Sequence, residues 1–308
     1  MFLGANGPVT VFVGGAWWRS MNETPPAPLP QTFVHRDRTV TLRRLAASDV
    51  DGLDALYRSL PVRDRHRRFF TDAAPPRRTV ERYAALLDDP GFGVVAVAAD
   101  GRIVAEAGYA RPAGGDGEFG ITVAGDWRGL GSVLLDRITA QAATAGVRGL
   151  RADVLPDNAA MLRLAARRGY ALIHTADRTV LRMIIGTGAT VPPWPQGTPA
   201  PRLLVETSGG NWRAAAEAEA AGFHVLSCPG RTAIRTGRCP VLHGEACPLV
   251  EGCDAVVVAL PHEQDPAALA HHHRRRHPGL PVVIDEVGDG GRPSAEQIVA
   301  ALVASLAV

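Results

Sequence analysis

The spacing of apolar positions changes several times along the first half of the chain, and each spacing predicts a different element. Residues 39–44 alternate between polar and apolar positions, as a strand does. Residues 93–110 form two apolar runs around the turn pair Asp100-Gly101, a pattern typical of a β-hairpin. Residues 50–57 and 79–87 place apolar side chains at the three- and four-residue intervals of helices. We therefore expect a domain that mixes strands and helices.

A strand, a glycine turn and a helix follow one another after residue 118. Residues 119–123 are apolar and predict the strand, and residues 128–132 read Arg-Gly-Leu-Gly-Ser. The helix that follows carries apolar residues on one face, and residues 149–155 predict the next strand. A glycine turn that opens a helix presents bare backbone N–H groups at the positive end of the helix dipole. The pattern predicts a phosphate or pyrophosphate site.

The second half of the chain has a different pattern. Proline is frequent over residues 186–201, which predicts a stiff, extended linker. Short apolar strands then alternate with helices, an order typical of a parallel sheet covered on both faces. The expected strands are residues 203–206, 223–227, 255–260 and 282–285, and the expected helices are residues 212–221, 266–276 and 295–306.

Composition narrows the function classes. The 308 residues are 46% hydrophobic and 21% charged, which fits a soluble globular protein of two domains. The net charge of +2 does not favour nucleic acid as a partner, and no apolar run approaches the roughly 20 residues of a membrane span. All 33 basic residues are arginine. Residues 1–37 are interpreted as a disordered leader without the basic start of a signal peptide, so we expect a cytoplasmic protein.

The run from residue 118 to residue 170 resembles the acetyl-CoA-binding core of the GNAT acetyltransferase superfamily. Arg128 and Gly131 match the first two fixed points of the family's pyrophosphate motif, and Val133 stands at the third. Closer likeness is to bacterial protein-lysine acetyltransferases, called Pat-like, which carry a glutamate five residues before a valine in this strand. Glu118 and Val123 have that spacing. Residues 59–70 and 154–161 are similar to two further segments of the same group.

The resemblance implies a fold, a cosubstrate and a binding site. The fold would be an α+β domain with a mixed, mostly antiparallel sheet, and the cosubstrate would be acetyl-CoA. The strand before the turn would offer backbone N–H groups to the thioester and pantetheine. The implied cofactor-binding residues are Ile121, Thr122, Val123, Arg128, Gly129, Leu130, Gly131, Ser132 and Asn158.

The resemblance also implies two catalytic residues. Glu118 would be the general base, because a lysine amine with a pKa of about 10.4 must lose a proton before it attacks. Tyr170 would protonate the coenzyme A thiolate. Each has a structural interpretation as well, Glu118 as a solvated carboxylate and Tyr170 as a core residue. The acceptor would be a protein lysine, with a small-molecule amine or a non-catalytic acyl-CoA sensor as alternatives.

The second half resembles a response-regulator receiver domain in layout, with its chemistry missing. Receiver domains need an acidic pair after the first strand, an aspartate after the third and a late lysine. This chain has Glu206-Thr207-Ser208 and Leu260-Pro261 at those places and no lysine. We expect a degenerate receiver-like module without phosphorylation chemistry, possessing at most a regulatory role. The predicted parts are a leader over 1–37, a GNAT domain over 38–187, a linker over 188–201 and the receiver-like domain over 202–308.

Four cysteines lie within the second half, at positions 228, 239, 247 and 253. Their spacing lacks the Cys-x-x-Cys pairs of ordinary zinc sites. A metal site, a redox switch and simple packing of thiols all remain open, and no metal ligand is assigned.

Overall fold

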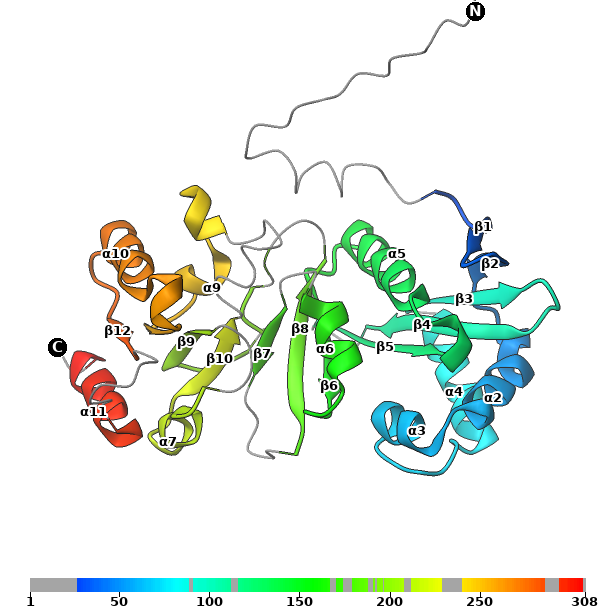
Figure 1. Ribbon diagram of the computed structural model, residues 1–308, viewed down its shortest axis with the longest axis horizontal. Coiled ribbons are helices and arrows are strands. Elements are labelled where there is room, and N and C mark those ends of the chain that lie inside the picture. The colour runs from blue at the N-terminus through cyan, green and yellow to red at the C-terminus, as the bar shows by residue number, and fades with distance from the viewer. Residues whose placement is uncertain are drawn as a thin grey trace, which may run out of the picture.

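The structure is a computed structural model, and it describes residues 27–88, 91–111, 116–166, 170–173, 179–187, 191, 193–195, 197–207, 212–228, 240–285 and 294–306. A single mixed sheet runs through this part of the chain (Figure 1). Its twelve strands have the order β1-β2-β3-β4-β5-β6-β8-β7-β10-β9-β11-β12. The mixed α/β fold class expected from the sequence is confirmed.

The strands are β1 Gln31–His35, β2 Arg38–Arg44, β3 Phe92–Ala98, β4 Ile103–Ala110, β5 Gly117–Val123, β6 Gly149–Val154, β7 Ala171–Ile173, β8 Leu181–Gly186, β9 Arg202–Thr207, β10 His224–Cys228, β11 Ala255–Ala259 and β12 Val282–Ile284. The α-helices are α2 Val50–Ser59, α3 Val62–Phe69, α4 Arg77–Asp88, α5 Leu130–Thr144, α6 Ala159–Ala166, α7 Ala215–Ala220, α9 Pro248–Glu251, α10 Pro266–Arg276 and α11 Ala295–Leu306. Short 3₁₀ helices are η1 Ala47–Asp49, η2 Gly125–Trp127, η3 Pro240–His243 and η4 His262–Gln264.

Strands β1 to β8 are mostly antiparallel. The β3–β4 hairpin forms as the sequence predicts, and Gly101 in its turn has a φ of +84°. Among the described strands of this half, the one parallel pair joins β5 to β6, with only two residues of each strand in register. Because β5 and β6 pair over so short a length, the sheet is open between them beyond these residues.

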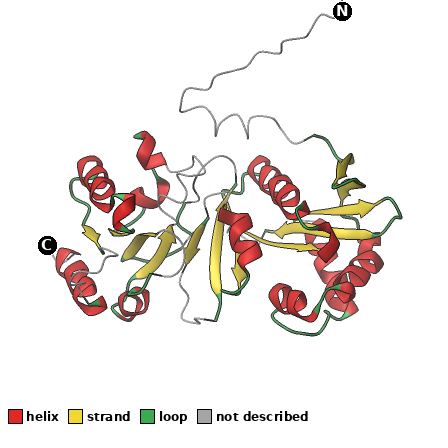
Figure 2. Ribbon diagram, viewed as in Figure 1, coloured by secondary structure: helices red, strands yellow, loops and turns green. Residues whose placement is uncertain are grey.

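Strands β9 to β12 form a parallel array in the order β10-β9-β11-β12. Helices lie on both faces of it, which is the doubly wound layout that alternating strands and helices predict (Figure 2). The antiparallel pairing of β10 with β7 connects this array to the first half, through Leu226 opposite Ile173 and Ser227 opposite Leu172. The two halves therefore share backbone hydrogen bonds.

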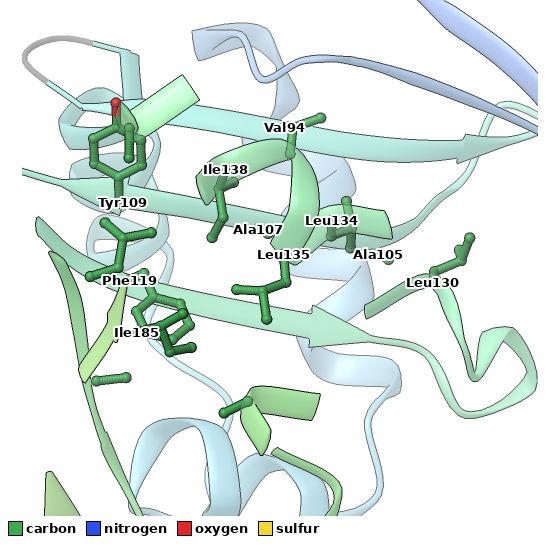
Figure 3. Packing of buried hydrophobic residues seen from close by; sticks show 14 of the residues in the cluster. Val94, Ala105, Ala107, Tyr109, Phe119, Leu130, Leu134, Leu135, Ile138 and Ile185 are labelled. Carbon is green, nitrogen blue, oxygen red and sulfur yellow. The ribbon is translucent and has the colours of Figure 1, made fainter. Parts of the chain in front are cut away.

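Two layers of helices cover the first half of the sheet. Helix α5 packs on one face, while α2, α3 and α4 lie on the other (Figure 1). The buried face of α5 presents Leu130, Leu134 and Ile138, which are four residues apart and meet the apolar face of β3, β4 and β5 (Figure 3). The spacing in the sequence thus fixes which side of α5 faces the sheet, and with it the position of the turn that precedes the helix.

Strand β1 corrects part of the predicted leader. Phe33 lies opposite Val40 and packs against the main core, while Thr32 and Val34 point away. This alternation in burial is typical of a strand with one face on the core, and the strand order places β1 at the edge of the sheet. Residues 31–35 thus belong to the sheet, and residues 1–26 lie outside the described part of the chain.

The proline-rich segment after β8 is tied to the second half where it is described. Trp194 is buried, and its Nε1 donates to the Leu249 carbonyl at 2.7 Å. A buried tryptophan with a satisfied N–H fixes a segment strongly. Residues 188–190, 192 and 196 of the predicted linker lie outside the described residues. Within the described part of the chain, no helix has the length and apolar character needed to cross a bilayer.

Candidate functional site

Strands β5 and β6 separate almost as soon as they pair. Gly117 lies opposite Leu150 and Glu118 opposite Arg151, and the pairing ends there. Beyond this point β5 stays bonded to β4 as far as Val123, and β6 stays bonded to β8 as far as Val154. Among the described residues, each strand finds backbone partners on its outer edge only. The inner edge of β5 from Phe119 onward therefore offers backbone groups that an inserted ligand can satisfy.

A pocket of about 630 Å³ occupies this opening. Its walls come from α3, β5, the turn before α5, the end of β6 and the start of α6. Its size falls in the range of ordinary ligand pockets, about 300–1,000 Å³.

The turn before α5 is shaped to bind an anion. Gly129 is the residue before the helix and has a φ of +106°, a conformation that favours glycine. It has no side chain to cap the helix, and no protein partner for the Leu130 and Gly131 N–H groups is found among the described residues. The Ser132 N–H makes only a 3.3 Å bond to the Gly129 carbonyl. These donors stand at the positive end of a helix of 15 residues.

His35 supports this turn from the edge strand β1. Its Nε2 lies 3.1 Å from the Arg128 carbonyl, and since a carbonyl only accepts, Nε2 carries the proton. A Cβ added at Gly129 would lie 3.0 Å from the His35 ring. Farther along, Arg137 of α5 donates to the Gln31 side chain at 2.7 Å. The sequence did not indicate this support, because residues 31–35 were interpreted as leader.

Helix α3 and the turn before α6 meet across the pocket. Arg67 donates to the Asp157 carboxylate at 3.1 Å and to its carbonyl at 2.9 Å. The hydrogen bond from Arg67 lowers the pKa of the Asp157 carboxyl, which keeps the pair charged. The Asn158 side chain accepts from the Met161 N–H at 3.2 Å and so caps α6. Arg67 also lines the pocket, and its Nε is buried without a protein partner. A ligand could satisfy that donor.

Most of the predicted cofactor residues line the pocket. They are Ile121, Thr122, Val123, Arg128, Gly129, Gly131, Ser132 and Asn158. The Leu130 side chain is fully buried in the main core and does not line it, because this residue begins the buried face of α5. Its backbone N–H remains at the helix start.

The comparisons with known proteins agree with this geometry. The family model described as "Acetyltransferase (GNAT) domain" matches residues 39–171. Residues 39–171 form a GNAT acetyltransferase domain. This GNAT domain is an acyl-CoA-dependent N-acyltransferase, with acetyl-CoA as its cosubstrate.

Three solved structures are similar in part. The GNAT domain of S. lividans PAT is 25% identical, over 52% of this chain and 98% of that one, with a TM-score of 0.47. A phosphinothricin acetyltransferase from Sinorhizobium meliloti in complex with AcCoA is 19% identical, over 50% and 94%, with a TM-score of 0.40. A cAMP-binding acyltransferase from Mycobacterium smegmatis is 24% identical, over 51% and 46%, with a TM-score of 0.35.

The two predicted catalytic residues of the GNAT domain lie in contrasting surroundings. Glu118 is 69% exposed and sits at the closed end of the opening, next to the pocket-lining Phe119. Arg151 Nη2 lies 3.9 Å from its carboxylate. Tyr170 is buried in the main core and is not part of the pocket wall. Burial raises the pKa of the Tyr170 phenol. The structure thus leaves the acid role of Tyr170 as a prediction only.

A buried carboxylate in the GNAT domain was not predicted. Glu106 of β4 has 0% exposure and receives hydrogen bonds from Tyr57, Tyr83 and Thr122, and one from Arg68 as part of an ion pair. The sequence contained one indication of a buried charge at this position, because Glu106 is the single charged residue in the apolar strand Ile103–Ala110. Arg68 ends the basic run Arg63-Asp64-Arg65-His66-Arg67-Arg68, and such a run is more often a solvated face than part of a site.

The second half has a buried histidine–glutamate contact and several cysteine thiols. His273 Nε2 lies 3.0 Å from the Glu206 carboxylate, and both side chains are buried. Among the described residues, no cluster of three or more His, Cys, Asp or Glu could hold a metal ion. Cys228, Cys247 and Cys253 are not in disulfides, and Cys239 lies outside the described residues.

We predict that Gly129→Ala weakens acetyl-CoA binding by about tenfold or more, because it strains the turn and collides with His35. The matched control is Gly101→Ala, at a position that also has a positive φ but has nothing within 4 Å of the added Cβ. Both changes should lower the free energy of unfolding by about 1–2 kcal/mol. Calorimetric titration with acetyl-CoA checks this, and equal affinities for the two variants would contradict the role of the turn.

We also predict that the Cys247 and Cys253 thiols are unreactive in the folded protein. Burial raises the pKa of Cys247 to about 11 and that of Cys253 to about 12. Little thiolate is then present at pH 8.5, so iodoacetamide should label both sites slowly until urea unfolds the chain. Because the folded state holds these protons more tightly, the free energy of unfolding should fall as pH rises from about 9 to 12. Rapid labelling of the native protein, read by mass spectrometry, would favour a redox role instead.

Proposed function

We propose that the GNAT domain transfers an acetyl group from acetyl-CoA to the side-chain amine of a protein lysine, with Glu118 as general base. One observation carries this proposal. The opening between β5 and β6 ends at an exposed carboxylate and begins at a helix N-terminus without a side-chain cap.

The dimensions of the opening support the assignment of its two ends. From residue 118 to residue 123 of β5, five steps of about 3.4 Å span about 17 Å. An extended pantetheine arm covers such a distance. The diphosphate of acetyl-CoA then lies at the Leu130 and Gly131 N–H groups, and the thioester lies near Glu118 at the other end. The inner edge of β5 binds the pantetheine amides through its free backbone groups.

The chemistry at the closed end follows from these positions. The lysine ammonium gives a proton to the Glu118 carboxylate, and the neutral amine attacks the thioester carbon. The C–N bond forms while the carbonyl electron pair moves onto oxygen. Collapse of this intermediate breaks the C–S bond, and the thiolate takes up the second proton of the nitrogen. The products are an acetylated amine and coenzyme A.

The exposure of Glu118 favours a protein as the acceptor. A lysine side chain is long and flexible, and it can reach an exposed carboxylate while its own protein stays outside the pocket. A small polyamine would instead need an enclosed acidic pocket. Arg151, at 3.9 Å from Glu118, is a charged neighbour whose side chain would meet the acceptor surface.

The second half is proposed to be a regulatory module without phosphorylation chemistry, in an enzyme that acts in the cytoplasm. The β7–β10 pairing supports a connection to the catalytic half, because β7 follows α6, whose first turn lines the pocket. The ligand or signal of this module is not assigned.

Glu118→Gln should lower kcat for acetyl transfer by about 10²- to 10⁴-fold, since the variant cannot take up the proton. The affinity for acetyl-CoA should not change, because residue 118 lies beyond the phosphate and pantetheine contacts. The matched control is Glu263→Gln, an exposed glutamate in η4 of the second half. The assay measures release of coenzyme A with an N-terminally blocked lysine peptide, and with spermidine as a small amine.

Three outcomes separate the alternatives. Turnover of the peptide that depends on Glu118 supports the proposal. Turnover of spermidine alone would move the assignment to a small-molecule acetyltransferase. Binding of acetyl-CoA with no turnover of either amine, in the wild type and both variants, would overturn the enzymatic role and leave a sensor of acyl-CoA.

A further inference from the structure

We infer that Arg68 is a catalytic residue, whose guanidinium donates a hydrogen bond to the reacting carbonyl oxygen as it becomes negatively charged. This inference rests on the proposed function, since it needs a thioester beside β5. It begins with the place of Arg68, which lines the pocket from α3 with a side chain that is 23% exposed.

The guanidinium occupies the side-chain space of Gly120. A Cβ added at Gly120 would lie 2.7 Å from Arg68 Cζ and 3.1 Å from its Nη1. Side chains alternate along a strand, so residue 120 presents the same face of β5 as Glu118, two residues earlier. Arg68 therefore lies over the inner part of the opening, on the side where Glu118 lies.

Three of the five guanidinium hydrogens are already used by the protein. Nε donates to the Thr122 hydroxyl at 3.1 Å, and Nη2 donates to the Tyr83 hydroxyl at 3.0 Å and to Glu106 at 3.4 Å. For the two Nη1 hydrogens, the described residues provide no partner. Nη1 is also absent from the buried polar atoms that lack a partner, so it reaches the solvent of the pocket.

The surrounding network holds this donor in one place. The Thr122 and Tyr83 hydroxyls donate hydrogen bonds to Glu106 at 2.7 and 3.0 Å, and the Tyr57 hydroxyl donates to it at 3.3 Å. Burial raises the pKa of both tyrosines, so they remain donors. A charged donor fixed before the reaction stabilises a developing oxyanion without reorganisation.

Glu106 also explains how a cation can lie beside an amine substrate. Its carboxylate is fully buried and forms an ion pair with Arg68. The pair as a whole is neutral, so its field on the incoming lysine ammonium is weak at a distance, while Nη1 still acts at hydrogen-bond range. During attack the carbonyl electron pair moves onto oxygen, and Arg68 Nη1 donates to that oxygen until the C–S bond breaks.

Two variants, Gly120→Ala and Arg68→Lys, test the inference: the first retains Arg68 itself, and the second keeps a cation at position 68 for Glu106. The added methyl of Gly120→Ala displaces the guanidinium, and Arg68→Lys keeps the positive charge but lacks Nη1. The matched control is Gly52→Ala, whose Cβ would also lie under 3 Å from a side-chain end, at 2.8 Å from Ile103 Cδ1, away from the pocket wall. Circular dichroism checks that each variant folds. If Gly120→Ala does not fold, the test of the inference rests on Arg68→Lys.

We expect kcat to fall about 100-fold in both variants, as when one oxyanion donor is lost, while it stays near the wild-type value in Gly52→Ala. The KM for the lysine peptide and the Kd for coenzyme A should change less than about twofold. A raised KM with an unchanged kcat would place Arg68 on the acceptor and overturn the inference, as would an unchanged kcat in either folded variant.

The proposed function can fail separately from this inference. Absence of turnover in the wild type contradicts the proposed function, and the role of Arg68 falls with it. If turnover depends on Glu118 but is unchanged in Gly120→Ala and Arg68→Lys, only the role of Arg68 is contradicted, and the proposed function stands.

Discussion

The separation of β5 and β6 is the constraint on which the site depends. A sheet gains stability by pairing every strand, and here the pairing of two neighbours stops after Glu118 and Arg151. Each strand compensates on its other edge, β5 with β4 and β6 with β8. The unpaired inner edge would be unfavourable in a dry interior, but it lines a pocket of about 630 Å³ and can be satisfied by a ligand with its own amide groups.

The groups around this opening are positioned by contacts behind them. Helix α5 packs on the sheet through Leu130, Leu134 and Ile138, and this packing determines where the N-terminus of the helix points. His35 supports the turn before that helix from the edge strand. On the opposite face, Glu106 ties β4 to β5 through Thr122 and to α2 and α4 through two tyrosines. The opening is therefore bordered by elements that are fixed on both faces of the sheet.

The local pattern of the sequence was enough to predict much of this arrangement. The β3–β4 hairpin follows from two apolar runs around Asp100-Gly101, and the turn at Gly129 follows from two glycines between a strand and an amphipathic helix. Asn158 caps α6 as its place before that helix indicates. Each of these features depends on residues close in the sequence.

The features that the sequence did not indicate depend on distant contacts. Residues 31–35 become a strand by pairing with β2, and His35 meets a carbonyl 93 positions away. The Arg68–Glu106 pair joins residues 38 positions apart, so a basic run on α3 could not be distinguished from an ordinary exposed face. The β7–β10 pairing likewise depends on tertiary packing, because a short strand does not specify its neighbour by composition.

A crystal structure of the protein with coenzyme A tests the central claim most directly. The account predicts the diphosphate within hydrogen-bond distance of the Leu130 and Gly131 N–H groups, with the pantetheine arm between β5 and β6 and the sulfur at the Glu118 end. Coenzyme A bound elsewhere, or β5 and β6 paired along their full length, would contradict it.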